Sequence, residues 1–311
     1  MKHYFSRRRF LRSSTQALGA ATLGSAFAPL ASAQSAATEI TITDLGYASV
    51  IHGAGGNVLV IPGMNEDGCL MVDGGLAANS DALLAAAFDI TKQSRVHTLI
   101  NTHWHPEQTG SNERVGAEGG VIIAHENTKM TLQNAVMSAL FEGRYGPLAD
   151  VGIPNQTISG NGTMKFAGQE IIYGYLPAAH TNGDIFLYLP ILDTLITGGP
   201  VTMEQWPVMD IRQGAWMGGL LNAYDILSQV VSADTVVVPA HGPVTNGTEI
   251  LRMRAMFTLI HLKLAEELNK GMGPDDIVAM NLFKEHEEQF GANSQFLDFA
   301  HRSLQIAYLP D

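Results

Sequence analysis

The chain of 311 residues is poor in cysteine and in positive charge. Its single cysteine, Cys69, has no second cysteine with which to form an intramolecular disulfide. One thiol also excludes cysteine-rich zinc ribbons and iron–sulfur clusters held by this chain alone, because those sites need several thiolates. Any metal must therefore be bound by histidines and carboxylates. Lysine and arginine number 18 against 30 aspartates and glutamates, a formal charge of -12, which argues against nucleic acid as a partner.

The remaining composition is that of a globular protein. Hydrophobic residues make up 46% of the chain, charged residues 15%, and the mean hydropathy is +0.07. A chain of this length and composition buries a large core. No low-complexity block or linker rich in proline and serine interrupts the chain after its first residues, so we expect one continuous domain over residues 34–311.

Residues 1–33 have the parts of a bacterial twin-arginine signal peptide. The basic segment SRRRFLR at 6–12 precedes an uncharged stretch rich in Ala, Leu and Gly, and small residues at 31–33 form a cleavage site. The alternative is a membrane anchor, but the stretch is near the ~18-residue lower limit of a spanning helix and its small residues make a poor span. We therefore expect twin-arginine export machinery as a partner, a periplasmic or secreted protein, and no stable membrane anchor after cleavage.

The apolar pattern of the remaining chain predicts two sets of strands, each followed by helices. Short apolar runs separated by Gly and Pro predict strands, and longer Ala/Leu-rich or amphipathic stretches predict helices. Strands are expected within 40–72, 96–100, 121–124, 164–196 and 235–238, and helices at 79–90, 127–140, 220–231, 249–268, 274–282 and 294–308. This order indicates an α/β protein with two sheets enclosed by helices. A doubly wound nucleotide-binding fold is disfavoured, because no Gly-x-Gly-x-x-Gly follows the first strand.

Four of the eleven histidines follow strand-like runs, where functional sites are commonly built. His103 and His105 are two residues apart, so in an extended backbone both side chains point to one side, where they can meet one metal ion. His180 could supply a third imidazole, leaving a fourth position on Zn²⁺ for water. A lone histidine at a strand end is more often a packing residue. Here His103 and His105 form a close pair, and His180 and His241 also follow strand-like runs, which favours a metal site. His125 is a candidate for a helix cap or for supporting a ligand.

In these segments the chain resembles the metallo-β-lactamase fold superfamily. The resemblance spans nearly all of the predicted mature chain and rests on four segments in order: MVDGG at 71–75, THWHPEQ at 102–108, AHTNGD at 179–184 and VPAHGP at 238–243. It implies a four-layer αββα sandwich with a first metal site at His103, His105 and His180. It also implies that Asp73, Thr181 and Asp184 orient these ligands by hydrogen bonds without binding the metal themselves.

The chain departs from the superfamily's pattern at its second metal site. Glu107 and Gln108 stand where the superfamily has Asp-His, and the segment TGGP at 197–200 has no carboxylate where the metal-bridging aspartate belongs. Glu107, Gln108 and His241 could hold a second ion only weakly. We therefore expect one zinc ion, and a second is doubtful.

The resemblance implies a hydrolase that acts on a small molecule. Water bound to zinc becomes a nucleophile at neutral pH, so one ion suffices to attack an ester, lactone or amide. Glu107 could orient the water or act as general base, and His241 could bind substrate or stabilise an oxyanion. The alternatives are an inactive binding protein that retains at most one metal and, more weakly supported, a β-lactamase.

Overall fold

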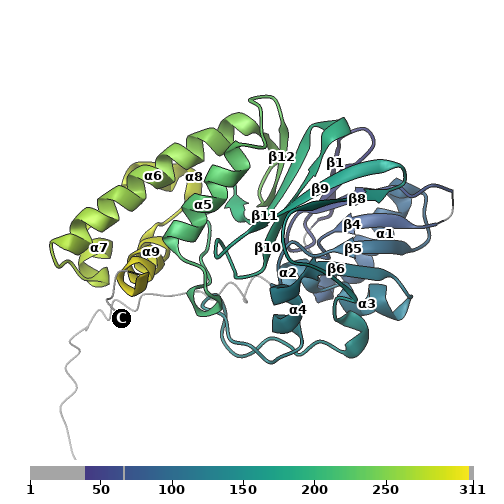
Figure 1. Ribbon diagram of the computed structural model, residues 1–311, viewed down its shortest axis with the longest axis horizontal. Helices are drawn as coiled ribbons and strands as arrows, with labels where there is room; N and C mark the ends of the chain where they lie inside the picture. The colour runs from purple at the N-terminus through teal and green to yellow at the C-terminus, as the bar shows by residue number, and fades with distance from the viewer. Residues whose placement is uncertain (1–38, 66, 308–311) are drawn as a thin grey trace, which may run out of the picture.

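The computed structural model describes residues 39–65 and 67–307 (Figure 1). The expected signal peptide and its cleavage site lie outside these residues. Among the described helices, none combines the length and the apolar character that crossing a membrane requires.

Seven strands form the first sheet, in the order β1-β2-β3-β4-β5-β6-β7. The chain runs antiparallel from β1 to β4 and parallel from β4 to β7. The bounds are β1 (Thr41–Asp44), β2 (Ser49–His52), β3 (Val58–Ile61), β4 (Cys69–Val72), β5 (Val96–Ile100), β6 (Val121–His125) and β7 (Gln156–Ile158).

Six strands form the second sheet, in the order β13-β12-β11-β10-β9-β8. Its strands pair antiparallel except for β11 and β12, which run parallel. The bounds are β8 (Gly162–Phe166), β9 (Gln169–Leu176), β10 (Asp184–Leu189), β11 (Thr194–Thr202), β12 (Val236–His241) and β13 (Thr245–Asn246).

The α-helices cover the outer faces of the two sheets (Figure 1). The apolar side chains of α5, α6 and α9 pack on the second sheet, and those of α1 and α3 pack on the first. The bounds are α1 (Ser80–Thr91), α2 (Pro106–Thr109), α3 (Asn112–Ala117), α4 (Glu126–Leu132), α5 (Met217–Ser228), α6 (Gly247–Asn269), α7 (Pro274–Met280), α8 (Glu287–Phe290) and α9 (Ser294–Ala307).

The central apolar layer lies between the two sheets. Leu59, Val72 and Ile100 of the first sheet share one buried cluster with Ile185 and Val238 of the second. Alternate residues of β3 and β4 point outward and meet α1 instead, as the two-residue period of a strand requires. These layers confirm the predicted four-layer αββα sandwich. Cys69 lies buried in the outer layer, where burial raises the pKa of its thiol to about 11.

The helix predicted at 127–140 is wrong beyond its first half. The observed helix α4 ends at Leu132, and the chain then forms an irregular loop. Val136 and Tyr145 exchange backbone hydrogen bonds within this loop, both 2.9 Å long. Ser138 and Ala139 are bonded to Asp210, which is far away in sequence. Tertiary hydrogen bonds thus replace the helical bonds that the apolar spacing suggested.

A candidate metal centre

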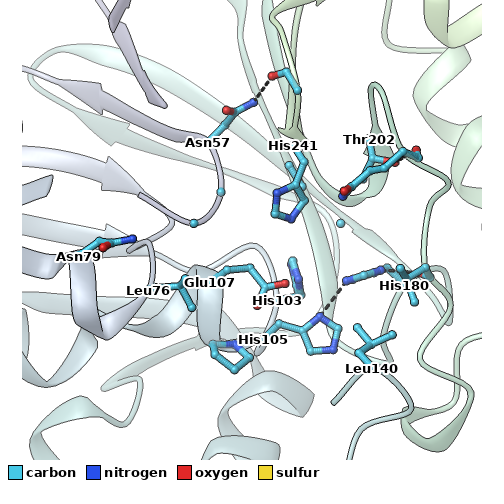
Figure 2. Close-up of a pocket in the computed structure, with 18 of the residues that line it drawn as sticks. Asn57, Leu76, Asn79, His103, His105, Glu107, Leu140, His180, Thr202 and His241 are labelled. Atoms are coloured by element: carbon cyan, nitrogen blue, oxygen red, sulfur yellow. Dashed lines mark hydrogen bonds between the residues drawn. The ribbon is translucent and has the colours of Figure 1, made fainter. Parts of the chain in front are cut away.

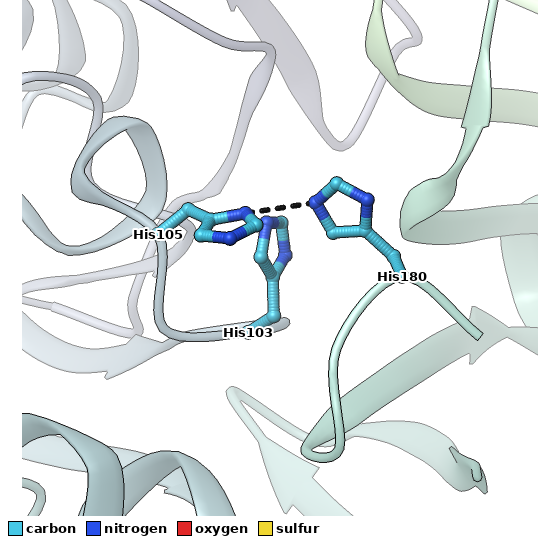
Figure 3. A group of neighbouring side chains, drawn as sticks. All are labelled: His103, His105 and His180. Carbon is cyan, nitrogen blue, oxygen red and sulfur yellow. Dashed lines mark hydrogen bonds between the residues drawn. The ribbon is translucent and has the colours of Figure 1, made fainter. Parts of the chain in front are cut away.

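Three histidines from two loops meet where the two sheets adjoin (Figure 3). His103 and His105 lie between β5 and α2, and His180 lies in the loop between β9 and β10. One nitrogen of each imidazole lies within 4.8 Å of the corresponding nitrogens of the other two, and all three side chains are buried. The backbone at 102–105 is bent rather than extended, so the geometry assumed for the pair was wrong although the two rings do converge.

His103 is oriented by the hydroxyl of Thr102, which is itself hydrogen-bonded to the carboxylate of Asp73. The Thr102 hydroxyl lies 2.9 Å from Asp73 Oδ2, to which it donates, and 3.1 Å from His103 Nδ1, whose proton it accepts. The Nε2 atom of His103 is buried, has no hydrogen-bond partner within residues 39–65 and 67–307, and faces the other two rings. Burial raises the pKa of Asp73 to about 8, although hydrogen bonds from Thr102 oppose the shift. Asp73 therefore acts on His103 through Thr102.

His180 is held by a backbone carbonyl. Its Nδ1 atom donates to the oxygen of Val208 at 2.5 Å, which leaves Nε2 as the free acceptor nitrogen. Burial, aided by the neighbouring His105, lowers the pKa of His180 to about 3, and burial also lowers that of His103. Both imidazoles are consequently neutral at neutral pH, the state in which a histidine binds a metal.

His105 is held by Asp210, a residue that the sequence analysis did not single out. Its Nε2 atom lies 3.2 Å from Asp210 Oδ2, to which it donates. Burial alone would raise the pKa of Asp210, but hydrogen bonds from His105 and Ser138 hold it below its usual value. An ionised, fully buried carboxylate therefore fixes this imidazole, with Nδ1 turned toward the other two histidines.

These bonds leave three imidazole lone pairs directed at one point, which is the arrangement that a cation needs. The Nδ1 atom of His105 and the Nε2 atom of His180 lie 2.8 Å apart (Figure 3). Since the second nitrogen of each ring already carries the proton, two acceptors would face each other unless a proton or a metal ion lies between them. With Nε2 of His103, these two nitrogens form a donor set that fits a divalent transition metal. Three imidazoles would bind the metal, and one coordination position would remain open.

Asp184 and Thr181 support the turn that carries His180. The Asp184 carboxylate accepts hydrogen bonds from the backbone nitrogens of His180 and Thr181, at 2.7 and 2.8 Å, and from the Thr181 hydroxyl at 2.6 Å. Burial raises the pKa of Asp184 to about 7 against these bonds. This carboxylate thus positions the ligand through its backbone, whereas the sequence analysis left open which atoms it would hold.

Glu107 and His241 line the same cavity but lie outside the three-histidine cluster. Glu107 lies on α2 with its carboxylate beside His103, and His241 at the end of β12 turns its ring toward the same centre (Figure 2). Burial lowers the pKa of His241, although the charge of Glu107 opposes the shift. His241 is consequently neutral at neutral pH and able to donate one hydrogen bond.

Neither Gln108 nor Gly199 provides a well-placed ligand for a second metal ion. The amide of Gln108 is fully buried, has no hydrogen-bond partner among the described residues and does not line the cavity. At Gly199 a Cβ atom would lie 2.1 Å from Cδ2 and 2.5 Å from Cγ of His180. The ring of His180 therefore fills the space that a side chain at position 199 would need.

A cavity of about 1080 Å³ opens over the histidines (Figure 2). This volume is slightly above the ~300–1,000 Å³ usual for small-molecule sites. The apolar part of its wall comes from both halves of the chain and includes Leu76, Leu140, Phe141, Val208 and Val244. Arg144 is the one lysine or arginine among the described residues that line it, and this side chain is exposed.

A hydrogen-bond chain beside the cavity joins the two halves, and the sequence analysis missed it. Thr43 donates to Nε2 of His52 at 2.9 Å, and Nδ1 of His52 donates to Asn57 Oδ1 at 2.6 Å. The amide nitrogen of Asn57 then donates to the carbonyls of Pro239 and Gly242, both at 2.9 Å (Figure 2). Asn57 thereby fixes the turn that carries His241. No spacing rule links these positions in the sequence.

Comparison with known proteins agrees with this fold. The family model of the metallo-beta-lactamase superfamily matches residues 52–257. Among solved structures, a metallo-beta-lactamase from Pontibacter korlensis is 21% identical with a TM-score of 0.58, over 71% of this chain and 99% of that one. The DIM-1 metallo-beta-lactamase is 16% identical with a TM-score of 0.55, over 71% and 98% of the two chains.

A longer protein is also similar in fold. The inverting sec-alkylsulfatase Pisa1 from Pseudomonas sp. is 17% identical with a TM-score of 0.64, and the match covers 87% of this chain but 50% of that enzyme. A search of curated protein sequences found no match. On the family match and the shared architecture, the chain belongs to the metallo-beta-lactamase superfamily.

Proposed function

We propose that the chain is a metal-dependent hydrolase that works with one zinc ion. The observation that carries the proposal is the convergence of three acceptor nitrogens: Nε2 of His103, Nδ1 of His105 and Nε2 of His180. In each ring the other nitrogen is hydrogen-bonded to an oxygen atom of the protein, so each lone pair is free for a metal. Three imidazoles with an open position are typical of catalytic rather than structural zinc sites.

The single ion is supported by the crowding at Gly199. A second ion would need a bridging carboxylate there, but His180 occupies the space next to this glycine. Glu107 and His241 remain as potential ligands near the centre, while the Gln108 amide does not line the cavity. Two ligands hold a second zinc ion poorly when no carboxylate bridges the two ions. We therefore assign catalytic roles to Glu107 and His241.

Zinc held by three imidazoles lowers the pKa of a bound water from about 15.7 to about 7, which makes a nucleophile available at neutral pH. Glu107 would take up the proton of such a water and pass it to the leaving group, because its carboxylate lies inside the cavity beside the cluster. His241 donates its N–H to the oxyanion that develops on the substrate. The apolar wall beside Leu140 and Phe141 excludes water from the substrate's remaining groups.

The lining of the cavity favours a neutral ester, lactone or amide. Glu107, Glu142 and Glu204 line it, and the exposed Arg144 supplies the one guanidinium that the described part of the chain contributes to the lining. A β-lactam antibiotic carries a carboxylate and an alkyl sulfate carries a sulfate, so each would bring a negative charge without meeting a buried cation other than the metal. We therefore rank a β-lactamase or sulfatase activity below hydrolysis of an uncharged substrate.

We also propose that the protein acts in the periplasm or outside the cell. The support is the order of parts in residues 1–33, which fits twin-arginine export and cleavage after Ala33. This route carries folded proteins, so the metal centre could form before export.

Removal and return of the metal test the hydrolase. The purified protein is stripped with a chelator and assayed against phenyl esters, lactones, nitrocefin and an alkyl sulfate, before and after one equivalent of zinc, manganese or iron. We expect hydrolysis of at least one ester or lactone that falls by a factor of ~100 or more without metal and returns with it. Tight metal binding without turnover of any substrate would instead favour a binding protein that retains the fold.

A further inference from the structure

The loop of residues 136–145 forms one side of the cavity. Backbone hydrogen bonds between Val136 and Tyr145 close its base, and it contributes Leu140 and Phe141 to the wall. Figure 2 shows Leu140 next to His105, within the group of side chains around the candidate metal centre. The position of this loop therefore sets the shape of the space above the cluster.

The loop is fastened to a single buried carboxylate, that of Asp210. The Ser138 hydroxyl donates to Asp210 Oδ2 at 2.6 Å, and the backbone nitrogen of Ala139 donates to Oδ1 at 3.0 Å. The same hydroxyl accepts a hydrogen bond from the nitrogen of Leu140 at 3.0 Å, so it also places the residue that faces the cavity. Asp210 and Ser138 are both buried, which makes these bonds costly to lose.

The carboxylate oxygen that holds the loop is also the one that holds His105. Oδ2 of Asp210 accepts from Ser138 Oγ and from Nε2 of His105. A cation on Nδ1 of His105 withdraws electron density from the ring, so its N–H becomes a stronger donor to Asp210 and the carboxylate is held more firmly. An Asp210 held by His105 in turn presents a fixed acceptor to Ser138 and Ala139.

We propose that Asp210 is a positioning residue that couples the ligand His105 to the 136–145 loop, so that metal binding and closure of the loop stabilise each other. The inference rests on the proposed metal centre and adds a connection between that centre and the cavity wall. Because coupling between two equilibria is reciprocal, releasing the loop from the Asp210 carboxylate must weaken metal binding, even when the altered residue is hydrogen-bonded to none of the three histidines.

Ser138→Ala tests the coupling, because the Ser138 hydroxyl is hydrogen-bonded to Asp210 and makes no hydrogen bond to a histidine of the cluster within the described residues. The readouts are the zinc dissociation constant, the visible spectrum of the cobalt(II)-substituted protein, and hydrogen exchange of the loop amides with and without zinc. In the unaltered protein we expect zinc to slow exchange in the loop by about tenfold or more. In Ser138→Ala we expect zinc binding to weaken by about 3- to 10-fold, a shifted cobalt spectrum, and loss of the zinc effect on exchange.

Gln213→Ala is the matched control, since Gln213 also fastens the loop without touching the Asp210 carboxylate. Its amide donates to the backbone oxygen of Met137 at 2.9 Å. Faster loop exchange with an unchanged zinc constant and cobalt spectrum is expected for this variant. The inference is overturned if Ser138→Ala binds zinc as the unaltered protein does, or if both variants weaken zinc equally. Failure of the unaltered protein to bind any metal would instead refute the proposed function, and the coupling with it.

Discussion

Replacement of Gly199 by aspartate should strongly weaken metal binding instead of building a second metal site. A Cβ atom at this position would lie 2.1 Å from Cδ2 of His180, far inside any real contact. His180 cannot simply move aside, because its ring is buried and Nδ1 is bonded to the carbonyl of Val208. Displacing the ring turns Nε2 away from the other two imidazoles. We expect the affinity for zinc to fall by a factor of ~100 or more, since a ligand is lost with its support.

Gly199→Ala separates the steric effect from the added charge and should lose the metal as well. Gly160→Ala is the control, because its Cβ would meet nothing within 4 Å. Zinc content by mass spectrometry and thermal unfolding are measured for all three variants, the latter to show that the fold survives the ~1–3 kcal/mol cost of overpacking. Two zinc ions per chain in Gly199→Asp would contradict the claim that the ring of His180 leaves no room for a side chain at position 199.

Replacement of Glu107 by glutamine should stop hydrolysis while the metal stays bound. Glu107 lies outside the three-histidine cluster, so an amide at this position leaves all three proposed ligands in place. The amide cannot accept the proton of the attacking water, which removes general-base catalysis worth ~10²–10⁴ in rate. We expect kcat to fall by a factor of ~100 or more on whichever ester or lactone the screen identifies, with zinc content unchanged.

Glu204→Gln is the matched control for Glu107→Gln, since Glu204 is a carboxylate of the cavity lining on an exposed part of the chain. This variant should keep kcat within about twofold, because an exposed charge is well screened. Loss of zinc from Glu107→Gln would identify Glu107 as a metal ligand, and unchanged turnover would exclude it as the base.

The fold could be predicted because the strands carry their own signals. Apolar runs such as 96–100 and 185–189 are bounded by turn residues and reappear as β5 and β10. The predicted strand around 194–196 proved longer, since β11 runs through Gly198 and Gly199 to Thr202. The helix expected at 127–140 failed because hydrogen bonds to Asp210 decide the conformation of its second half, and the sequence does not display them.

The candidate site was predictable where its residues lie close together in sequence. The pair His103 and His105 and the turn around His180 stand in recognisable segments. Asp210 and Asn57 escaped notice because each acts across the fold: Asp210 is 105 positions from His105, and Asn57 is 182 positions from Pro239. Their roles follow from tertiary contact, which a single sequence does not reveal.

The number of metal ions per chain is the most direct test of the central claim, that three histidines hold one catalytic metal. The protein is purified without chelator or an affinity tag of histidines and analysed by mass spectrometry beside a His103→Ala/His180→Ala double variant. The account predicts one ion per chain, absent from the double variant while thermal unfolding stays cooperative. Two ions per chain, or one that persists in the double variant, would contradict it.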